Sequence, residues 1–180
     1  MSNIVLGGGR CNPPTQGHWV LIRKLEELAD QLGVRAEMFV IDGEQSGQDK
    51  QKNPLTPEQR VAILREWFPR VRFDIASSAY EMMEILEVQA KRPVVMVAGS
   101  DRAKKYRRLL DYAGFVSAQI MELDRESGEA DGVSATKARA AAEAGDFEEF
   151  VRMMPSKVGF DSLRESYDLV RKALIKDGDG

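Results

Sequence analysis

Short apolar runs alternate with segments of helical periodicity along most of the chain. Five runs predict buried strands, at residues 4–6, 38–41, 71–73, 94–98 and 118–123. Between the runs, apolar residues recur every three or four positions, as at Leu21, Leu25 and Leu28, which is the spacing of one helix face. Strands that alternate with crossover helices are typical of a parallel sheet with helices on both faces. The pattern therefore predicts an α/β protein with a parallel five-stranded sheet.

The ends of several predicted helices carry recognisable signals. Gly33 follows the first helical segment, at the position where glycine commonly ends a helix. Thr56 is a natural N-cap, Pro57 suits the first helical position, and Gln59 completes a capping box. The chain after the last strand is predicted to be helical. We therefore predict a core at residues 1–142 and a C-terminal helical extension of the same domain at residues 143–180.

Length and composition narrow the class of protein. The 180 residues suit one domain, and the net charge of −3 argues against general nucleic-acid binding. No run approaches the roughly 18 apolar residues of a membrane span. Cys11 is the single cysteine, which excludes an internal disulfide and a cysteine-rich metal site and favours a reducing compartment. We expect a soluble, cytoplasmic protein with no nucleic-acid or membrane partner.

The loop after the first strand has the composition of a phosphate site. The glycines at residues 7–9 let the backbone approach a ligand closely, and the following helix start offers N–H groups and a positive dipole end. Arg10 and His18 add donors. Gly-Lys-Ser/Thr occurs nowhere in the chain, and Asn12 stands where a dinucleotide fingerprint needs its third glycine. The sequence therefore supports neither a P-loop nor a typical dehydrogenase.

A second candidate anion site follows the fifth predicted strand, at residues 131–139. Ser134 is predicted to be an N-cap with Thr136 in the first helical turn. Hydroxyls, N–H groups, Lys137 and Arg139 would then converge at one helix start. Taken alone, the segment also fits an ordinary capped helix with solvated basic residues.

Together the two loops resemble the paired signatures of the HxGH/ISxTxxR nucleotidyltransferase superfamily. Residues 9–18 read GRCNPPTQGH, against the pattern G-x-F-x-P-x-[HT]-x-G-H, and residues 134–139 read SATKAR. The Gly9-Arg10 start is similar to nicotinamide-nucleotide adenylyltransferases, and Thr15 is similar to phosphopantetheine adenylyltransferase. Cys11 replaces the usual aromatic residue, and Ala135 replaces the usual glycine or serine. The resemblance covers about residues 3–142 and implies a Rossmann-like fold.

Two middle segments add to the resemblance. Residues 53–60 read NPLTPEQR and resemble the NPFTxxER segment of nicotinamide-nucleotide adenylyltransferases, which implies that Arg60 serves the substrate phosphates. Arg102 follows the strongest predicted strand in the segment Gly99-Ser100-Asp101-Arg102, where Asp101 is a candidate helix cap and Arg102 could face a phosphate. Both segments are also compatible with capped surface helices.

The resemblance implies direct in-line attack of an acceptor phosphate oxygen on the α-phosphorus of a nucleoside triphosphate, with pyrophosphate leaving. Catalysis would consist of positioning and charge stabilisation. The implied catalytic residues are His18, Thr15, Arg10 and Arg139. The implied nucleotide-binding residues are Gly8, Gly9, Asn12, Gly17, Arg102, Ser134 and Thr136. Arg60 is the implied acceptor-phosphate residue. Magnesium would arrive with the triphosphate, because no cluster of carboxylates predicts a dedicated metal site.

The favoured reading is transfer of AMP from ATP to a phosphorylated small molecule, with nicotinamide mononucleotide as the leading acceptor. The alternatives within the class are a cytidylyltransferase and a phosphopantetheine adenylyltransferase. An alternative of another class is a non-catalytic nucleotide-binding or regulatory module on the same fold. The sequence is compatible with a homo-oligomer and determines neither the base nor the acceptor.

Overall fold

The computed structural model describes residues 1–43, 49–123 and 130–176, with the side chains of 130–133 and 176 left aside. Its strands form a single five-stranded sheet in the order β3-β2-β1-β4-β5, and every neighbouring pair is parallel. The strands are β1 (Ser2–Gly9), β2 (Arg35–Ile41), β3 (Arg72–Ala76), β4 (Lys91–Gly99) and β5 (Gln119–Leu123). The predicted α/β fold with a parallel five-stranded sheet is confirmed.

The strand order defines where a ligand can bind. The first strand, β1, lies in the middle, with β2 and β3 on one side and β4 and β5 on the other. The chain thus reverses its direction of progress between β1 and β4, and ligands of open α/β sheets bind at such a switch point, beyond the carboxyl ends of the strands. The loops that follow Gly9 and Gly99 both start at this edge.

Helices cover both faces of the sheet because its strands are buried on both sides. On one face, α1 (Gln16–Leu32) and α2 (Pro57–Trp67) pack against strand residues such as Val5. On the other, α3 (Ala79–Val88) and α4 (Ala103–Tyr112) pack against neighbours in β1 such as Leu6. Consecutive strand residues point to opposite faces, so one apolar strand supplies both halves of the core.

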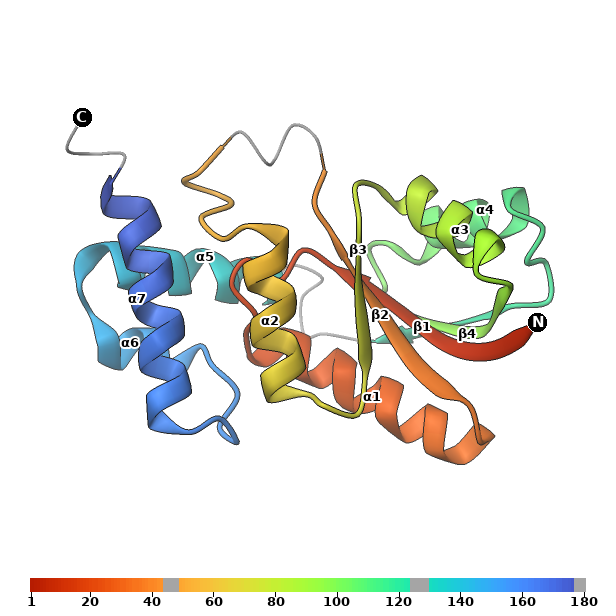
Figure 1. The fold of residues 1–180 in the computed structure, drawn as a ribbon, viewed down its shortest axis with the longest axis horizontal. Coiled ribbons are helices and arrows are strands. Elements are labelled where there is room, and N and C mark those ends of the chain that lie inside the picture. The colour runs from red at the N-terminus through yellow and green to blue at the C-terminus, as the bar shows by residue number, and fades with distance from the viewer. Residues whose placement is uncertain (44–48, 124–129, 177–180) are drawn as a thin grey trace.

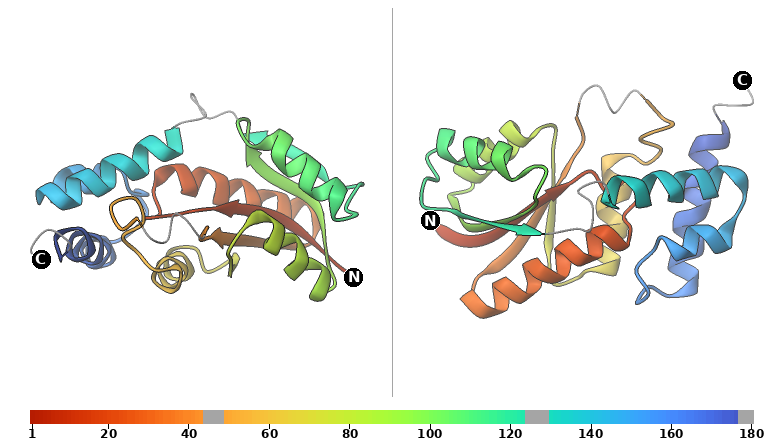
Figure 2. Two further views of the ribbon diagram at one scale, coloured as in Figure 1. Left: turned by 90° about the horizontal axis from the view of Figure 1, so that it is seen from above. Right: turned by 180° about the vertical axis from the view of Figure 1, so that it is seen from behind.

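The C-terminal region forms three further helices, α5 (Ala130–Ala144), α6 (Phe147–Arg152) and α7 (Phe160–Lys176). They gather at one end of the molecule, with α3 and α4 at the other (Figures 1 and 2). Phe150 of α6 and Tyr167 of α7 belong to the same apolar cluster as α1 and α2, and their ring centroids lie 5.4 Å apart. Residue 142, where we expected the core to end, lies inside α5.

Two predicted helix boundaries, at Gly33 and at Thr56, are confirmed. Gly33 adopts φ 65° at the end of α1, in the left-handed region that glycine tolerates best. The Gln59 amide donates to Thr56 Oγ1, and the Gln59 side chain accepts from the Thr56 amide. Asp101 was expected to cap α4, but Arg102 occupies that position with no side-chain cap.

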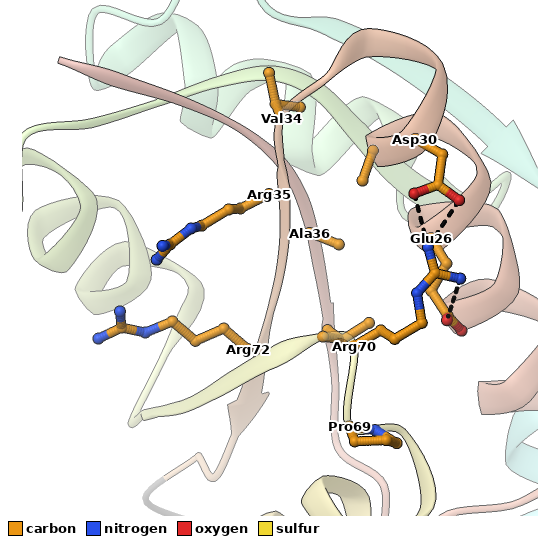
Figure 3. Close-up of a pocket in the computed structure, with 10 residues that line it drawn as sticks. Glu26, Asp30, Val34, Arg35, Ala36, Pro69, Arg70 and Arg72 are labelled. Carbon is orange, nitrogen blue, oxygen red and sulfur yellow. Dashed lines mark hydrogen bonds and ion pairs between the residues drawn. The ribbon is translucent and has the colours of Figure 1, made fainter.

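A surface hollow lies at the opposite, amino-terminal edge of the sheet, between α1 and the starts of β2 and β3 (Figure 3). Arg70 spans it with ion pairs to Asp30 at 2.7 Å and Glu26 at 3.3 Å. Arg35 and Arg72 point away from that ion-paired group. The hollow is therefore separate from the edge where the predicted site loops begin. In the described part of the chain, no helix has the length and apolarity needed to cross a membrane.

Candidate active site

The last two residues of β1, Gly8 and Gly9, pack closely against side chains from other elements. A Cβ at Gly9 would lie 3.2 Å from Met38 Cε and 3.7 Å from His18 Cδ2. A Cβ at Gly8 would lie 3.4 Å from the Tyr106 hydroxyl. Glycine at these positions therefore lets Met38, His18 and Tyr106 pack directly against the backbone at the end of β1.

His18 is held by the turn that begins α1. It is buried, with only 3% of its surface exposed, and its Nδ1 accepts a hydrogen bond of 3.0 Å from the Thr15 amide. Thr15 Oγ1 lies 3.1 Å from the same nitrogen. A neutral imidazole that accepts at Nδ1 carries its proton at Nε2, and this nitrogen is buried. Gly17, half-buried in the same turn, has no side chain that could block a ligand.

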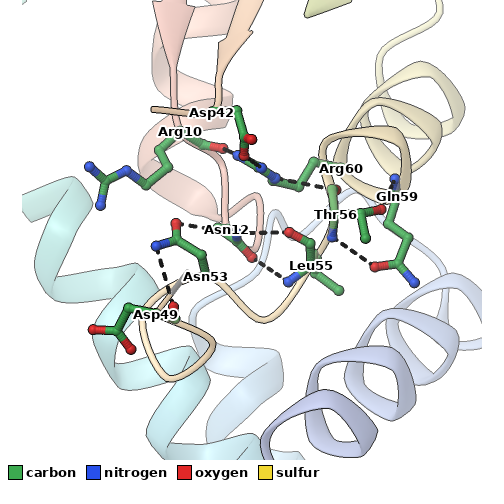
Figure 4. A network of polar contacts seen from close by, with 9 residues as sticks. All are labelled: Arg10, Asn12, Asp42, Asp49, Asn53, Leu55, Thr56, Gln59 and Arg60. Carbon is green, nitrogen blue, oxygen red and sulfur yellow. Dashed lines mark hydrogen bonds and ion pairs between the residues drawn. The ribbon is translucent and has the colours of Figure 1, made fainter. Parts of the chain in front are cut away.

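Asn12 joins this loop to the segment at residues 53–55 (Figure 4). Its side chain accepts from the Leu55 amide at 2.9 Å and donates to the Leu55 carbonyl at 3.1 Å. A further contact of 3.5 Å runs from Asn12 Nδ2 to Asn53 Oδ1. The amide of Asn12, expected to touch nucleotide, is thus used to dock a second loop against the first.

Arg60 ties α2 to the same loop from the other side. Its side chain has no exposed surface, forms an ion pair with Asp42 at the end of β2, and donates from NH1 to the Arg10 carbonyl at 2.9 Å. Its Nε also donates to the Thr56 carbonyl at 3.3 Å. These contacts hold Asp42 and Arg10 beside each other, as Figure 4 shows. The phosphate contact expected of Arg60 stays a prediction, and in this geometry its guanidinium serves protein groups.

Arg139 brings the two predicted motifs together. Its NH1 donates to the Asn12 carbonyl at 2.9 Å, and its NH2 donates to Thr136 Oγ1 at 3.2 Å. The Arg139 side chain therefore links helix α5 to the loop after β1, although the two lie far apart in the sequence. This contact places the first predicted segment beside the second.

The electrostatics of this junction favour an anion. Burial and the nearby positive charge of Arg10 lower the pKa of Arg139, and Asp49 opposes them by raising it. The Arg10 side chain is exposed and points away from Arg60 (Figure 4). Like charges repel each other, and a bound anion would weaken the repulsion between these two arginines. A polyphosphate group would relieve that repulsion.

The expected N-cap at Ser134 is wrong. Helix α5 begins at Ala130, so Ser134 lies in its second turn, where it is half-buried, and Thr136 is exposed one residue beyond Ala135. Arg139 consequently lies in the middle of the helix and not one turn from its start. A serine is a frequent N-cap, but it also fits a helix interior, so the residue type could not locate the helix start. The loop expected to begin at Asp124 falls outside the described residues.

Arg102 lies at the start of α4, exposed beside Ser100 and Asp101. It is on the carboxyl edge of the sheet, as predicted, because it follows β4. The contacts described for residues 1–43 and 49–123 include none between its side chain and the loop after β1. The structure thus brings together Arg10, Asn12, Thr15, His18 and Arg139 and leaves Arg102 at the rim.

Two contributors were missed by sequence reasoning. Asp42 was marked only as the start of a loop, and its pairing with Arg60 was not foreseen. Its position directly after a buried strand was the available signal, since polar residues there face the ligand edge of a parallel sheet. Leu55 binds Asn12 through its backbone amide and carbonyl, and a pattern of side chains cannot predict such a contact. Among the described residues, no three His, Cys, Asp or Glu side chains gather in a way that could hold a metal ion.

At the switch point of the parallel sheet, the structure combines a turn that holds His18 with an arginine from the distant helix α5 that binds the loop after β1. The chain belongs to the cytidylyltransferase-like family, whose model matches residues 6–141. This membership makes it a nucleotidyltransferase at the level of class. No curated protein sequence gives a significant match.

Solved structures agree with the fold. A putative nicotinate-nucleotide adenylyltransferase from Vibrio parahaemolyticus aligns with TM-score 0.56 and 16% identity over 94% of this chain and 99% of that one. The Plasmodium falciparum nicotinic acid mononucleotide adenylyltransferase complexed with NaAD aligns with TM-score 0.56 and 12% identity over 99% and 97%. A macrolide-efflux protein from Streptococcus pneumoniae aligns at TM-score 0.55 and 17% identity over 84% of this chain, which spans 55% of that protein.

Proposed function

We propose that the protein transfers AMP from ATP to a phosphorylated small molecule and releases pyrophosphate. The observation that carries the proposal is the hydrogen bond from Arg139 to the Asn12 carbonyl. It joins the two motif segments of the family and leaves the Arg10 charge close to that of Arg139. A site of this kind suits the triphosphate of a nucleotide, which needs several cations and donors at once.

The residues divide the work of an in-line displacement. An acceptor phosphate oxygen forms a bond to the α-phosphorus of ATP while the bond to the bridging oxygen breaks and pyrophosphate departs. The Nε2–H of His18 would donate to the oxygens whose negative charge grows at this step, with Arg10 and Arg139 neutralising the departing phosphates. Thr15 orients His18 through its amide and hydroxyl. Magnesium enters with the nucleotide as part of the substrate.

The acceptor we favour is nicotinamide mononucleotide. Residues 53–60 support it, since they resemble the corresponding segment of nicotinamide-nucleotide adenylyltransferases and dock on Asn12 through Leu55. Two of the similar folds belong to nicotinate-nucleotide adenylyltransferases, one of them complexed with NaAD. The acceptor would then be a pyridine mononucleotide, bound where this segment and the first loop meet.

The test is a substrate panel with pyrophosphate release as the readout. ATP and CTP are each incubated with magnesium and with nicotinamide mononucleotide, phosphopantetheine, or glycerol and choline phosphates. We expect NAD formation from ATP to be fastest. Dephospho-coenzyme A as the fastest product, or a preference for CTP, would replace the acceptor or the base and keep the reaction class. Nucleotide binding without pyrophosphate release from any pair would support a non-catalytic module.

A further inference from the structure

The C-terminal extension contacts the turn that carries His18. The amide of Gln16, the first residue of α1, donates to the Met153 carbonyl at 2.9 Å. An amide at the first position of a helix has no acceptor inside its own helix, so this bond supplies one from a distant part of the chain. Gln16 directly follows Thr15, whose amide and hydroxyl contact His18.

The Met153 carbonyl is held in place by its surroundings. The Met153 amide donates to the Phe150 carbonyl at 3.1 Å, and Phe150 is fully buried. Met154 and Pro155, which follow, are also buried. A carbonyl between buried neighbours has little freedom to move, so it acts as a fixed reference point for the start of α1.

The C-terminal extension (residues 143–180) is also bound to helices α5 and α2, which contact the beginning of the loop after β1. Arg171 donates to the Ala142 and Glu143 carbonyls at the end of α5, at 2.8 and 2.9 Å. Ser162 donates to Glu66 of α2 at 2.6 Å. Helix α5 carries the arginine that binds the Asn12 carbonyl, and α2 carries the one that binds the Arg10 carbonyl. The C-terminal extension thus contacts helices α2 and α5, and together they contact the loop after β1 near Arg10 and Asn12 and at Gln16.

We propose that the extension, through the Met153 carbonyl, positions His18 for nucleotidyl transfer. The turn between Asn12 and Gln16 is held at its first residue by Arg139 and at its last by Met153, so the Thr15 contacts to His18 are set from both sides. The extension lies beyond residues 6–141, the part matched by the family model. This inference rests on the proposed function, because a positioning role requires that His18 acts in turnover.

Two substitutions at Gln16 separate the effect of the amide bond to Met153 from the effect of the Gln16 side chain. Gln16→Pro removes the donor, and proline is well tolerated at the first position of a helix. The preceding residue, Thr15, has φ −137° and ψ −179°, an extended conformation of the kind that a residue before proline adopts. Gln16→Ala is the matched control, since it keeps the amide and removes only an exposed side chain.

The first readout is the imidazole itself. His18 is the only histidine in the chain, so the ¹⁵N signals of a histidine-labelled sample report on it without ambiguity. We expect Gln16→Pro to shift these signals in the folded protein, and Gln16→Ala to leave them in place. A loss of global stability alone would not move them. Identical spectra for the two variants would overturn the proposal.

The second readout is steady-state kinetics with ATP and the best acceptor of the panel. We expect kcat to fall about tenfold or more in Gln16→Pro, because small misplacements of a catalytic group cost this much, with the KM for ATP changed less than about threefold. Gln16→Ala should keep the wild-type kcat. Equal kcat in the two variants contradicts the positioning role.

A third measurement on the unmodified protein covers the case in which Gln16→Pro does not fold. Hydrogen exchange should show the Gln16 amide protected at least about tenfold relative to an unstructured chain, because it is bonded to Met153. Exchange at the unprotected rate would refute the contact. If no substrate pair releases pyrophosphate, the proposed function fails, and the exchange and ¹⁵N results still decide whether the extension orients the histidine.

Discussion

At the scale of single residues, the same side chains serve the fold and the site. His18 is the third residue of α1, and its Nδ1 accepts from the Thr15 amide as the glutamate or glutamine of a capping box would. Arg139 donates to a backbone carbonyl and a hydroxyl while its charge lies near that of Arg10. A substitution at either position therefore has a structural and a chemical effect, which must be measured separately.

His18→Gln separates capping from chemistry. A glutamine at this position can still accept from the Thr15 amide, so the free energy of unfolding should stay close to wild type. It lacks the imidazole donor, and kcat should fall by about two orders of magnitude, the usual scale for one lost transition-state contact. His18→Ala should lose the same activity and also about 1 kcal/mol of stability. Chemical denaturation and initial rates measure both, and a His18→Gln protein with wild-type kcat would reduce His18 to a capping residue.

Arg139→Lys tests the junction of the two motifs. Lysine is a point charge that cannot bind the Asn12 carbonyl and Thr136 together with a phosphate, as a guanidinium can. We expect the KM for the triphosphate to rise about tenfold. Lys104→Ala, on the exposed face of α4, is the control and should leave the KM unchanged. Equally small effects in initial-rate measurements would mean that Arg139 is a structural residue only.

At the scale of elements, a helix start marked by several signals together was predictable, and one marked by a single candidate cap residue was not. Helix α2 begins where Thr56, Pro57 and Gln59 indicated, because each of these residues stabilises a specific position through its own backbone or side chain. Helix α5 begins before the serine that was expected to start it. The hydrogen bonds from α2 to the Arg10 carbonyl and from α5 to the Asn12 carbonyl join residues that are far apart in the sequence. Their contact could therefore not be predicted from local patterns.

Arg60→Met tests how much the contacts between α2 and the first loop contribute to stability. It leaves Asp42 without its buried partner and the Arg10 carbonyl without a donor, and should cost about 3 kcal/mol of unfolding free energy. That lies at the lower end of the usual range, because 32% of the Asp42 side chain is exposed. Arg65→Met is the matched control on the same helix, where an exposed arginine donates to the Phe73 carbonyl. Urea unfolding curves that shift equally for both would contradict a special role for Arg60.

At the scale of the whole molecule, the fold places every candidate residue on one side. A parallel sheet puts the carboxyl ends of all its strands at one edge, so the loops after β1, β2 and β4 all begin at that edge. The hollow at the other edge is lined by charges that pair with each other. The three C-terminal helices then close the end of the molecule next to α1 and α2 (Figures 1 and 2).

The metal requirement is a property of the whole chain. Because no cluster of ligating side chains occurs among the described residues, we predict that the purified protein carries no stoichiometric zinc or iron. Magnesium should be required for turnover, because it travels with the triphosphate. Elemental analysis and a titration with EDTA followed by magnesium test both parts. Stoichiometric zinc or iron, or full activity in excess EDTA, would contradict this account.

The sequence by itself determined the parallel sheet, the loop after the first strand and the residue types of the site. Periodicity and caps are local properties, and a few neighbouring residues suffice to state them. Tertiary structure alone decided which groups meet. The ion pair of the buried Arg60 with Asp42 could not be predicted from the sequence, and the phosphate contact of Arg60 stays a prediction. The Met153 carbonyl gives no sequence signal, because every residue has a backbone carbonyl. Contacts between backbone groups, and between residues distant along the chain, depend on the packing of whole helices, and no local pattern encodes that packing.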